Sequence, residues 1–138
     1  MISQEMKKNL TDMAVKVSEN SYSPYSNFCV GAALLCSDGK IYTGTNVENS
    51  SYGGANCAER TAIFTAITDG HRDFEAISII GHKRGENVNA FCAPCGICRQ
   101  IMSEFCSDDF IVLLYDGENI AEYKLKELLP LSFDKSML

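Results

Sequence analysis

The sequence predicts a three-layer α/β/α sandwich, in which a mixed five-stranded sheet carries helices on both faces. The chain has 138 residues, the size of one domain spanning 1–138, and its 46% hydrophobic content is enough to build a core. Apolar periodicity gives the order α-β-β-α-β-α-β-β. Two strand–helix–strand crossovers predict neighbouring parallel strands, and two short turns predict antiparallel hairpins, so the sheet is mixed.

The first half of the chain supplies one helix and one hairpin. Residues 4–19 place apolar side chains at helical spacing, which predicts an amphipathic helix. Residues 28–36 are apolar on both parities, as expected of a strand that is covered on both faces. The dipeptide Asp38-Gly39 then turns the chain into a second strand at 41–45.

The second half repeats the alternation of helices and strands. Pro94 suits the first turn of a helix, because its missing N–H would have no partner there. The loops at 46–56 and 81–93 are polar. The predicted elements are a helix at 57–68, a strand at 76–80, a helix from 94 to about 105, strands at 110–115 and 120–123, and a helical turn at 125–129.

Charge and composition exclude several classes of protein. The 12 basic and 18 acidic residues give a net charge of −6, whereas nucleic-acid binders normally present a basic surface to phosphates. No apolar run is long enough to span a bilayer, and the first eight residues lack the apolar stretch of a signal peptide. We therefore expect a cytoplasmic protein that binds neither membranes nor nucleic acids.

Three of the seven cysteines have the spacing of metal ligands. Cys95 and Cys98 are one helical turn apart, and Cys57 begins the other predicted helix. Helix N-termini stabilise thiolates. Three protein ligands leave the fourth tetrahedral position open, which is typical of a catalytic zinc, and Glu59 is close enough to handle a proton there. Arg60 would withdraw charge from the thiolates and strengthen the Lewis acid.

Simpler interpretations of these residues stay open at this point. The cysteines would also suit a structural zinc or unligated core thiols, and Cys92 with Cys95 forms another Cys-x-x-Cys that would suit a redox pair. Glu59 would also suit a first-turn carboxylate favoured by the helix dipole, and Arg60 a surface ion pair.

The motifs together resemble the cytidine deaminase family, in its short-chain branch with three zinc-binding cysteines. The resemblance extends from Tyr22 to Phe133. The stretches that carry it are residues 22–28 (YSPYSNF), 30–33 (VGAA), 46–49 (NVEN), 52–53 (YG), 57–62 (CAERTA) and 94–100 (PCGICRQ).

The resemblance implies an enzyme of pyrimidine salvage that hydrolyses cytidine and deoxycytidine to uridine and deoxyuridine and releases ammonia. It implies one zinc ion per subunit, held by Cys57, Cys95 and Cys98. Glu59 would take a proton from zinc-bound water and pass it to N3 of the ring, and the hydroxide would attack C4. Arg60 would support the thiolates.

The resemblance also implies a set of substrate contacts. Asn46 and Glu48 would bind ribose hydroxyls, Phe28 would pack against the nucleoside, and the backbone of Ala58 would hold the base edge. The resemblance further implies a homotetramer with shared active sites, in which Tyr52 and Phe133 would reach a neighbouring subunit's site. Loop chemistry for Asn46, a solvated charge for Glu48 and core packing for Phe28 and Phe133 are the simpler alternatives.

Two other functions remain to be distinguished. One is a deaminase of the same fold that acts on a modified nucleoside antibiotic or on a base within RNA. The sugar-binding pair Asn46 and Glu48 favours a free nucleoside, and the acidic balance disfavours a polynucleotide. The other is a structural zinc domain or a thiol redox sensor, in which Glu59 would be dispensable and a fourth protein ligand would close the metal site.

Overall fold

The computed structural model describes residues 2–138 and contains the eight main elements that the sequence predicts. The elements predicted at 4–19, 28–36 and 41–45 begin and end within one residue of their predicted bounds. The elements are α1 (Gln4–Ser18), β1 (Phe28–Cys36), β2 (Ile41–Thr45), the 3₁₀ turn η1 (Tyr52–Gly54), α2 (Ala58–Thr68), β3 (Phe74–Lys83), α3 (Gly96–Phe105), β4 (Ile111–Tyr115), β5 (Ile120–Lys124), α4 (Leu125–Leu128) and η2 (Lys135–Met137).

The sheet is mixed and five-stranded, as predicted, but one predicted neighbour relation is wrong. The strand order is β2-β1-β3-β4-β5, and only β3 and β4 are parallel neighbours. The crossover through α2 carries the chain from β2 past β1, so β3 pairs antiparallel with β1 and does not touch β2. Both ends of the sheet are hairpins, β1–β2 and β4–β5.

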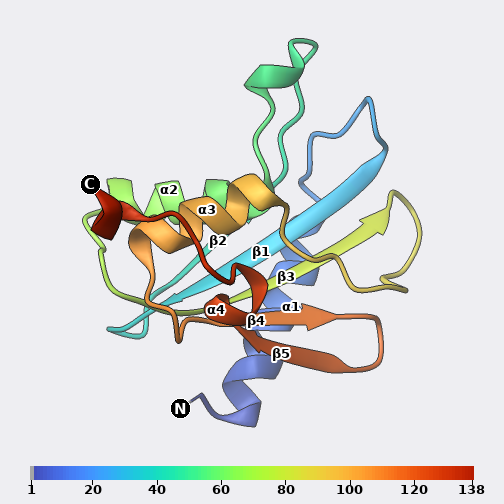
Figure 1. The fold of residues 1–138 in the computed structure, drawn as a ribbon. Helices are drawn as coiled ribbons and strands as arrows, with labels where there is room; N and C mark the ends of the chain where they lie inside the picture. Colours follow the sequence, from blue (N-terminus) through green and yellow to red (C-terminus); the bar gives the residue numbers. More distant parts are fainter. Residues whose placement is uncertain (1) are drawn as a thin grey trace.

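The three layers place one core on each side of this sheet, which confirms the α/β/α prediction. In Figure 1, α1 lies behind the sheet, and α2 and α3 lie next to each other in front of it. Leu10 and Ala14 of α1 pack against alternate residues of β1 and β3. Ala62, Ile63 and the residues around them fill the other core. Burial on both faces explains why residues 28–36 are apolar at both parities.

Two helix boundaries differ from the prediction in a way that affects the site. Pro94 lies outside α3, because Cys95 is the residue that caps the helix and Gly96 is its first helical residue. Cys57 is likewise the N-terminal cap of α2. Both cap residues have extended backbones, so their side chains are free of the helix and lie at its positive end.

The loop from Val47 to Asn56 forms an arm that projects from the body of the molecule. Figure 1 shows this arm, in green, rising beside the blue segment that precedes β1. Backbone bridges link Val47 to both Tyr22 and Asn56, so the two loops are joined at the base of the arm. None of the helices within residues 2–138 has the length and the apolar character needed to cross a bilayer.

We expect Gly44→Ala to destabilise the fold by about 3 kcal/mol, at the upper end of the cost of overpacking. A Cβ atom at Gly44 of β2 would lie 2.5 Å from the backbone nitrogen of Ala62 and 2.6 Å from the carbonyl oxygen of Ala58. Relief would require α2 to move away from the sheet, and α2 carries Cys57 and Glu59 at its start. Urea unfolding monitored by circular dichroism gives the change in free energy.

The matched control for stability is Gly53→Ala in the arm, where an added Cβ meets no atom within 4 Å. We expect its unfolding midpoint to match that of the unsubstituted chain. Equal midpoints for Gly44→Ala and Gly53→Ala would show that close packing of α2 on β2 contributes nothing to stability.

Candidate active site

The N-termini of α2 and α3 bring the three predicted cysteines together. Cys57 caps α2, Cys95 caps α3, and Cys98 lies in the first turn of α3. Their sulfur atoms all lie within 4.8 Å of one another, and those of Cys57 and Cys95 are 3.8 Å apart. That separation is far beyond a disulfide bond of about 2.05 Å, so the cysteines form a cluster of free thiols.

The cluster fits a zinc ion. Two thiolates on a tetrahedral zinc, each bonded at about 2.3 Å, lie about 3.8 Å apart, and this is the distance between Cys57 and Cys95. Cys95 is exposed, Cys57 is half-buried and Cys98 is buried, so the cluster has one open side. Three soft ligands with an open side match a catalytic zinc rather than a closed structural one.

Arg60 compensates the negative charge of the thiolates. Its Nη2 donates to the sulfur of Cys57 at 3.3 Å, whereas its Nε is buried and has no partner. A hydrogen bond from Cys98 and then the guanidinium of Arg60 lower the pKa of Cys57 to about 5, against the effect of burial. Cys57 is therefore a thiolate near neutral pH, which is the form that binds metal.

Glu59 is a buried carboxyl group beside the thiols. It is only 4% exposed, and burial is the first cause that raises its pKa to about 6. The negative charge of Cys57 raises the pKa further, and Arg60 lowers it. A first-turn carboxylate that served only the helix dipole would gain nothing from such burial, so the position favours a chemical role.

A cavity of about 410 Å³ opens over the cluster and includes most of the predicted site residues. From the prediction it contains Asn46, Glu48, Tyr52, Cys57, Ala58, Glu59, Arg60 and Cys95. Its other lining residues are Val30, Gly53, Ala55, Asn56, Cys92, Ala93 and Ile97. The volume is sufficient for a small organic molecule such as a nucleoside.

The two predicted sugar-binding residues offer the cavity opposite hydrogen-bonding groups, one a donor and the other an acceptor. The side-chain oxygen of Asn46 accepts from the backbone N–H of Val30 at 3.0 Å, and its nitrogen donates to the carbonyl of Phe28 at 2.8 Å. Glu48 accepts from the backbone N–H groups of Tyr25 and Ser26 and from the Ser26 hydroxyl, whose hydrogen bond is the first cause that lowers the pKa of Glu48. Asn46 thus retains a donor, and Glu48 is an acceptor.

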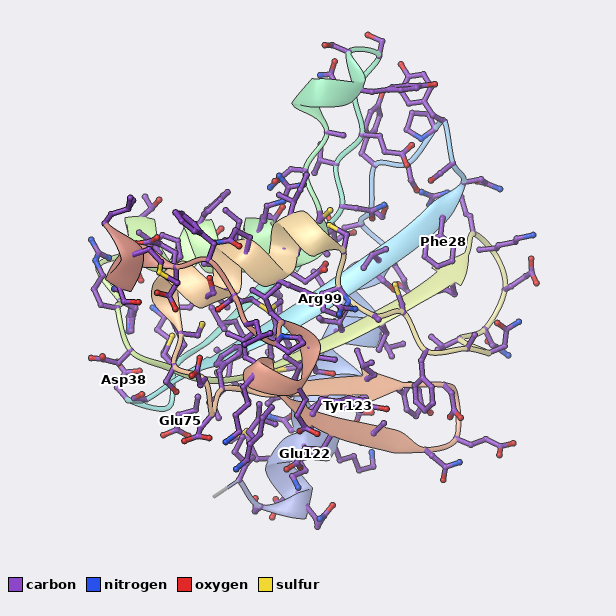
Figure 2. All side chains as sticks on the ribbon, in the orientation of Figure 1. Phe28, Asp38, Glu75, Arg99, Glu122 and Tyr123 are labelled. Atoms are coloured by element: carbon purple, nitrogen blue, oxygen red, sulfur yellow. The ribbon has the colours of Figure 1, made fainter. Side chains whose placement is uncertain are left out.

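Two predicted substrate contacts lie outside the cavity lining. Phe28 lies at the start of β1 (Figure 2), where its ring and the sulfur of Cys92 both cover Gly81. Phe133 is 62% exposed, and its carbonyl oxygen accepts from Gln100 at 2.7 Å, so the tail runs along α3. Their contacts with a nucleoside stay predictions.

Two residues that sequence reasoning did not assign to the site contribute to it. Cys92 lines the cavity, and burial raises the pKa of its thiol to about 11, which disfavours the redox pairing with Cys95. Arg99 (Figure 2) donates to the carbonyls of Pro94 and Leu128, both at 2.7 Å, and so fixes the segment before Cys95 against the end of α4. The contact with Leu128 has no local signal in the sequence.

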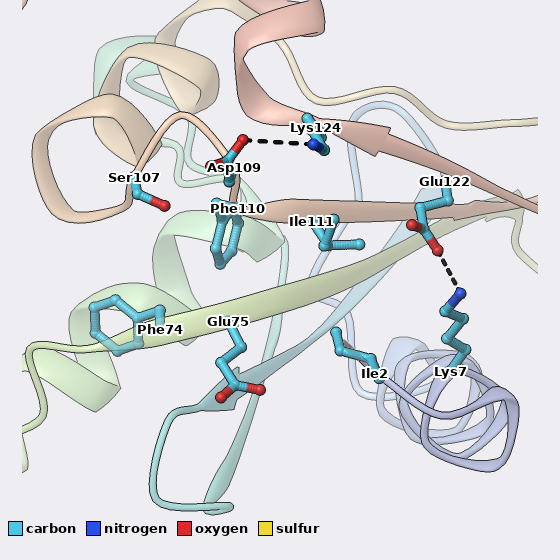
Figure 3. A pocket seen from close by; sticks show the side chains of 10 residues that line it. All are labelled: Ile2, Lys7, Phe74, Glu75, Ser107, Asp109, Phe110, Ile111, Glu122 and Lys124. Atoms are coloured by element: carbon cyan, nitrogen blue, oxygen red, sulfur yellow. Dashed lines mark ion pairs between the residues drawn. The ribbon is translucent and has the colours of Figure 1, made fainter.

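A second cavity, of about 440 Å³, lies between α1 and the strands β3, β4 and β5 (Figure 3). Its charged side chains are largely paired with one another: Lys7 with Glu122 at 2.5 Å, and Lys124 with Asp109 at 3.6 Å. None of the described residues that line it is a cysteine or a histidine. Its described lining therefore lacks the thiol groups that distinguish the cavity over the cysteine cluster.

A second group of side chains of metal-ligand type consists of Cys36, Asp38 and His71, and in it Asp38 and His71 are hydrogen-bonded directly to each other. His71 Nε2 lies 2.8 Å from a carboxylate oxygen of Asp38, closer than the roughly 3.3 Å expected for two such ligands on one tetrahedral zinc. Burial and then Asp38 raise the pKa of the Cys36 thiol to about 11. Tyr42 links His71 to Asp69, so this network connects the β1–β2 turn to the end of α2.

Comparison with known proteins agrees with the geometry. Residues 4–114 match the family model of the cytidine and deoxycytidylate deaminase zinc-binding region. The chain is 46% identical over 124 residues to the cytidine deaminase of Sporosarcina psychrophila, covering 89% of this chain and 88% of that one. The cytidine deaminase of Halalkalibacterium halodurans is also 46% identical, over 121 residues, with 87% and 88% covered.

A solved structure shows the same fold at comparable similarity. The crystal structure of cytidine deaminase from Burkholderia pseudomallei superimposes with a TM-score of 0.84 at 41% identity, covering 96% of this chain and all of that one. The zinc-binding region matched by the family model includes the three clustered cysteines and Glu59. The chain therefore belongs to the zinc-dependent cytidine and deoxycytidylate deaminase family.

Proposed function

We propose that this protein hydrolyses cytidine and deoxycytidine to uridine and deoxyuridine with release of ammonia, as a step of pyrimidine salvage in the cytoplasm. The observation that carries the proposal is a cluster of three thiols, two of which line the same cavity as one buried carboxyl group, that of Glu59. In this proposal Cys57, Cys95 and Cys98 hold the metal and Glu59 is the acid–base group. The kinship with cytidine deaminases supports the choice of base.

Zinc bound to the three thiolates supplies the Lewis acidity that makes water a nucleophile near neutral pH. Glu59 takes a proton from the attacking water and delivers it to N3 of the cytosine ring, while the water oxygen bonds to C4. Glu59 then takes the second proton from the new C4 hydroxyl and delivers it to the exocyclic amine; the C4–N4 bond breaks, the C4 oxygen becomes the carbonyl of the product, and ammonia leaves. The burial of Glu59 favours a carboxyl group that both accepts and returns protons near neutral pH.

The walls of the cavity support a free nucleoside as substrate. Asn46 retains a hydrogen-bond donor and Glu48 offers acceptors, and a sugar hydroxyl both donates and accepts. The backbone of Ala58 lies beside the acid–base group and would hold the base edge. The net charge of −6 disfavours a polynucleotide substrate.

We further propose a homotetramer in which subunits complete one another's sites. Tyr52 in the arm is 78% exposed although it borders the cavity, and Phe133 in the tail is 62% exposed. Large aromatic side chains exposed in this way are typical of surfaces that a partner covers. Light scattering of the purified protein tests the assembly, and a mass other than four chains contradicts it.

The direct test of the reaction is ultraviolet absorbance during incubation of the zinc-loaded protein with cytidine and, separately, with deoxycytidine. We expect loss of the cytosine absorbance and stoichiometric release of ammonia. If both nucleosides remain unchanged while the protein holds its zinc, the free-nucleoside assignment is wrong. A modified nucleoside and a single-stranded RNA are the substrates to assay next.

A further inference from the structure

Asn46 is held by the backbone in a single orientation of its side-chain amide. A backbone N–H only donates and a backbone carbonyl only accepts, so the contacts to Val30 N and Phe28 O fix which end of the amide is oxygen. The Asn46 oxygen accepts a second hydrogen bond from the Ser21 hydroxyl at 2.5 Å. Its acceptor capacity is therefore filled, and one N–H remains for the cavity.

Glu48 depends on the same part of the chain as Asn46. Its carboxylate is held by the backbone N–H groups of Tyr25 and Ser26, at 2.9 and 3.1 Å, and by the Ser26 hydroxyl. We call the segment from Ser21 to Asn27 the anchoring loop. The loop therefore holds the Glu48 carboxylate directly and contacts the Asn46 amide through the Ser21 hydroxyl, in addition to the two contacts that β1 makes with Asn46.

Arg84, which directly follows β3, fastens the anchoring loop at both ends. Its Nη2 donates to the carbonyl of Ser21 and to the hydroxyl of Ser23, each at 2.9 Å. Its backbone N–H donates to the carbonyl of Asn27, also at 2.9 Å. Asn27, where the loop ends, has φ of 57°, in the left-handed region that asparagine adopts more readily than most L residues.

We propose that Arg84 is a positioning residue for substrate selection: by fixing the anchoring loop it presents the Asn46 donor and the Glu48 acceptor to the sugar hydroxyls of the nucleoside. The inference rests on the proposed function, because it concerns the sugar end of the same cavity. Arg84 lies outside the cavity lining, so it acts through Ser21 and Ser23 and not by touching the substrate.

This role predicts a selective effect rather than a general loss of activity. The variant Arg84→Met keeps the length of the side chain and the backbone N–H but removes both side-chain hydrogen bonds. We expect kcat/KM for cytidine to fall about tenfold, mainly through KM, because loosened sugar contacts weaken binding of ground state and transition state alike. For 2′,3′-dideoxycytidine, which keeps only the 5′-hydroxyl and has no 2′- or 3′-hydroxyl for Asn46 and Glu48 to bind, we expect a change of less than about twofold.

Two further variants keep the test decisive. Ser21→Ala removes only the hydroxyl that donates to Asn46, and we expect the same selective loss at smaller size, whether or not Arg84→Met folds well. Arg72→Met is the matched control, since Arg72 also donates two hydrogen bonds, to the carbonyls of Ile67 and His71 at the far end of α2. We expect it to leave the preference for cytidine over the dideoxynucleoside unchanged.

The result that overturns the inference is an equal loss on both substrates in Arg84→Met and in Ser21→Ala. A mutant cycle gives an independent readout: in a background that carries both Asn46→Ala and Glu48→Ala, Arg84→Met should change KM for cytidine by less than about twofold. A full additional tenfold effect there would contradict coupling through these two side chains. Failure of the proposed function would be visible earlier, because the unsubstituted protein would then not convert cytidine at all.

Discussion

Glu59→Gln is expected to abolish nearly all deamination while the protein keeps its zinc. The amide has the size of the carboxyl group but cannot take a proton from water or return one to N3 and the leaving amine. Positioned acid–base groups contribute about 10²- to 10⁴-fold to the rate, so we expect kcat to fall about a thousandfold or more. The measurement is kcat for cytidine together with the zinc content of the same preparation by mass spectrometry.

The stability of this variant separates chemistry from folding. Glu59 is buried at the start of α2, and its neutral replacement removes a charge that burial disfavours. We therefore expect the free energy of unfolding of Glu59→Gln to equal or exceed that of the unsubstituted chain. An activity loss that is accompanied by unfolding would instead indicate a structural role.

The control for Glu59→Gln is Glu104→Gln on the exposed side of α3, which removes one carboxylate far from the cavity. We expect full activity and full zinc content. If Glu59→Gln retains more than about a tenth of the wild-type kcat, its carboxyl group is not the acid–base group, and the simpler interpretation as a helix-capping charge is correct.

Cys98→Ala is expected to lose both the metal and the activity. Cys98 is the buried member of the cluster and lies in the first turn of α3, so no side chain takes its place when the sulfur is removed. Two remaining thiols hold zinc far more weakly than three. We expect less than about 0.2 zinc per chain after dialysis and a loss of activity of at least a thousandfold.

Loss of zinc should also lower stability, because an ion that binds only the folded state stabilises it. A ligand present at a thousand times its dissociation constant adds about 4 kcal/mol. Thermal unfolding of the unsubstituted protein with and without a chelator gives the corresponding shift, and Cys98→Ala should respond to the chelator very little. An equal response of both proteins would show that the cluster does not hold the metal.

Two other cysteines serve as controls for the identity of the ligands. Cys106→Ala removes a half-buried thiol outside the cluster, and Cys92→Ala removes the neighbour of Cys95 in the alternative Cys-x-x-Cys. We expect one zinc per chain in both variants. A loss of zinc in Cys92→Ala would assign Cys92 to the metal site and require a revised ligand set.

The sequence by itself determined the elements and the chemical centre, because both depend on neighbours along the chain. Cys95 and Cys98 are separated by one helical turn, and Glu59 follows Cys57 by two residues, so local helix geometry brings each pair to one end of a helix. The double-sided apolar pattern of β1 likewise indicated a strand between two layers of helices.

Tertiary structure alone decided the relations between distant segments. The antiparallel pairing of β3 with β1 depends on which strand edge is free after the first hairpin, and local propensity contains no information on that. The place of Phe28 over Gly81, beside the cavity rather than in its lining, depends on the same pairing.

The same limit applies to Arg84, which no motif marks. Its hydrogen bonds reach residues 57 to 63 positions earlier in the chain, and they exist only because β3 returns alongside β1. Residue types and short spacings thus determine which chemistry the chain carries out. The packing of strands that are distant in sequence determines how the predicted sugar-binding groups are held, because hydrogen bonds between loops form only after the sheet has fixed their separation.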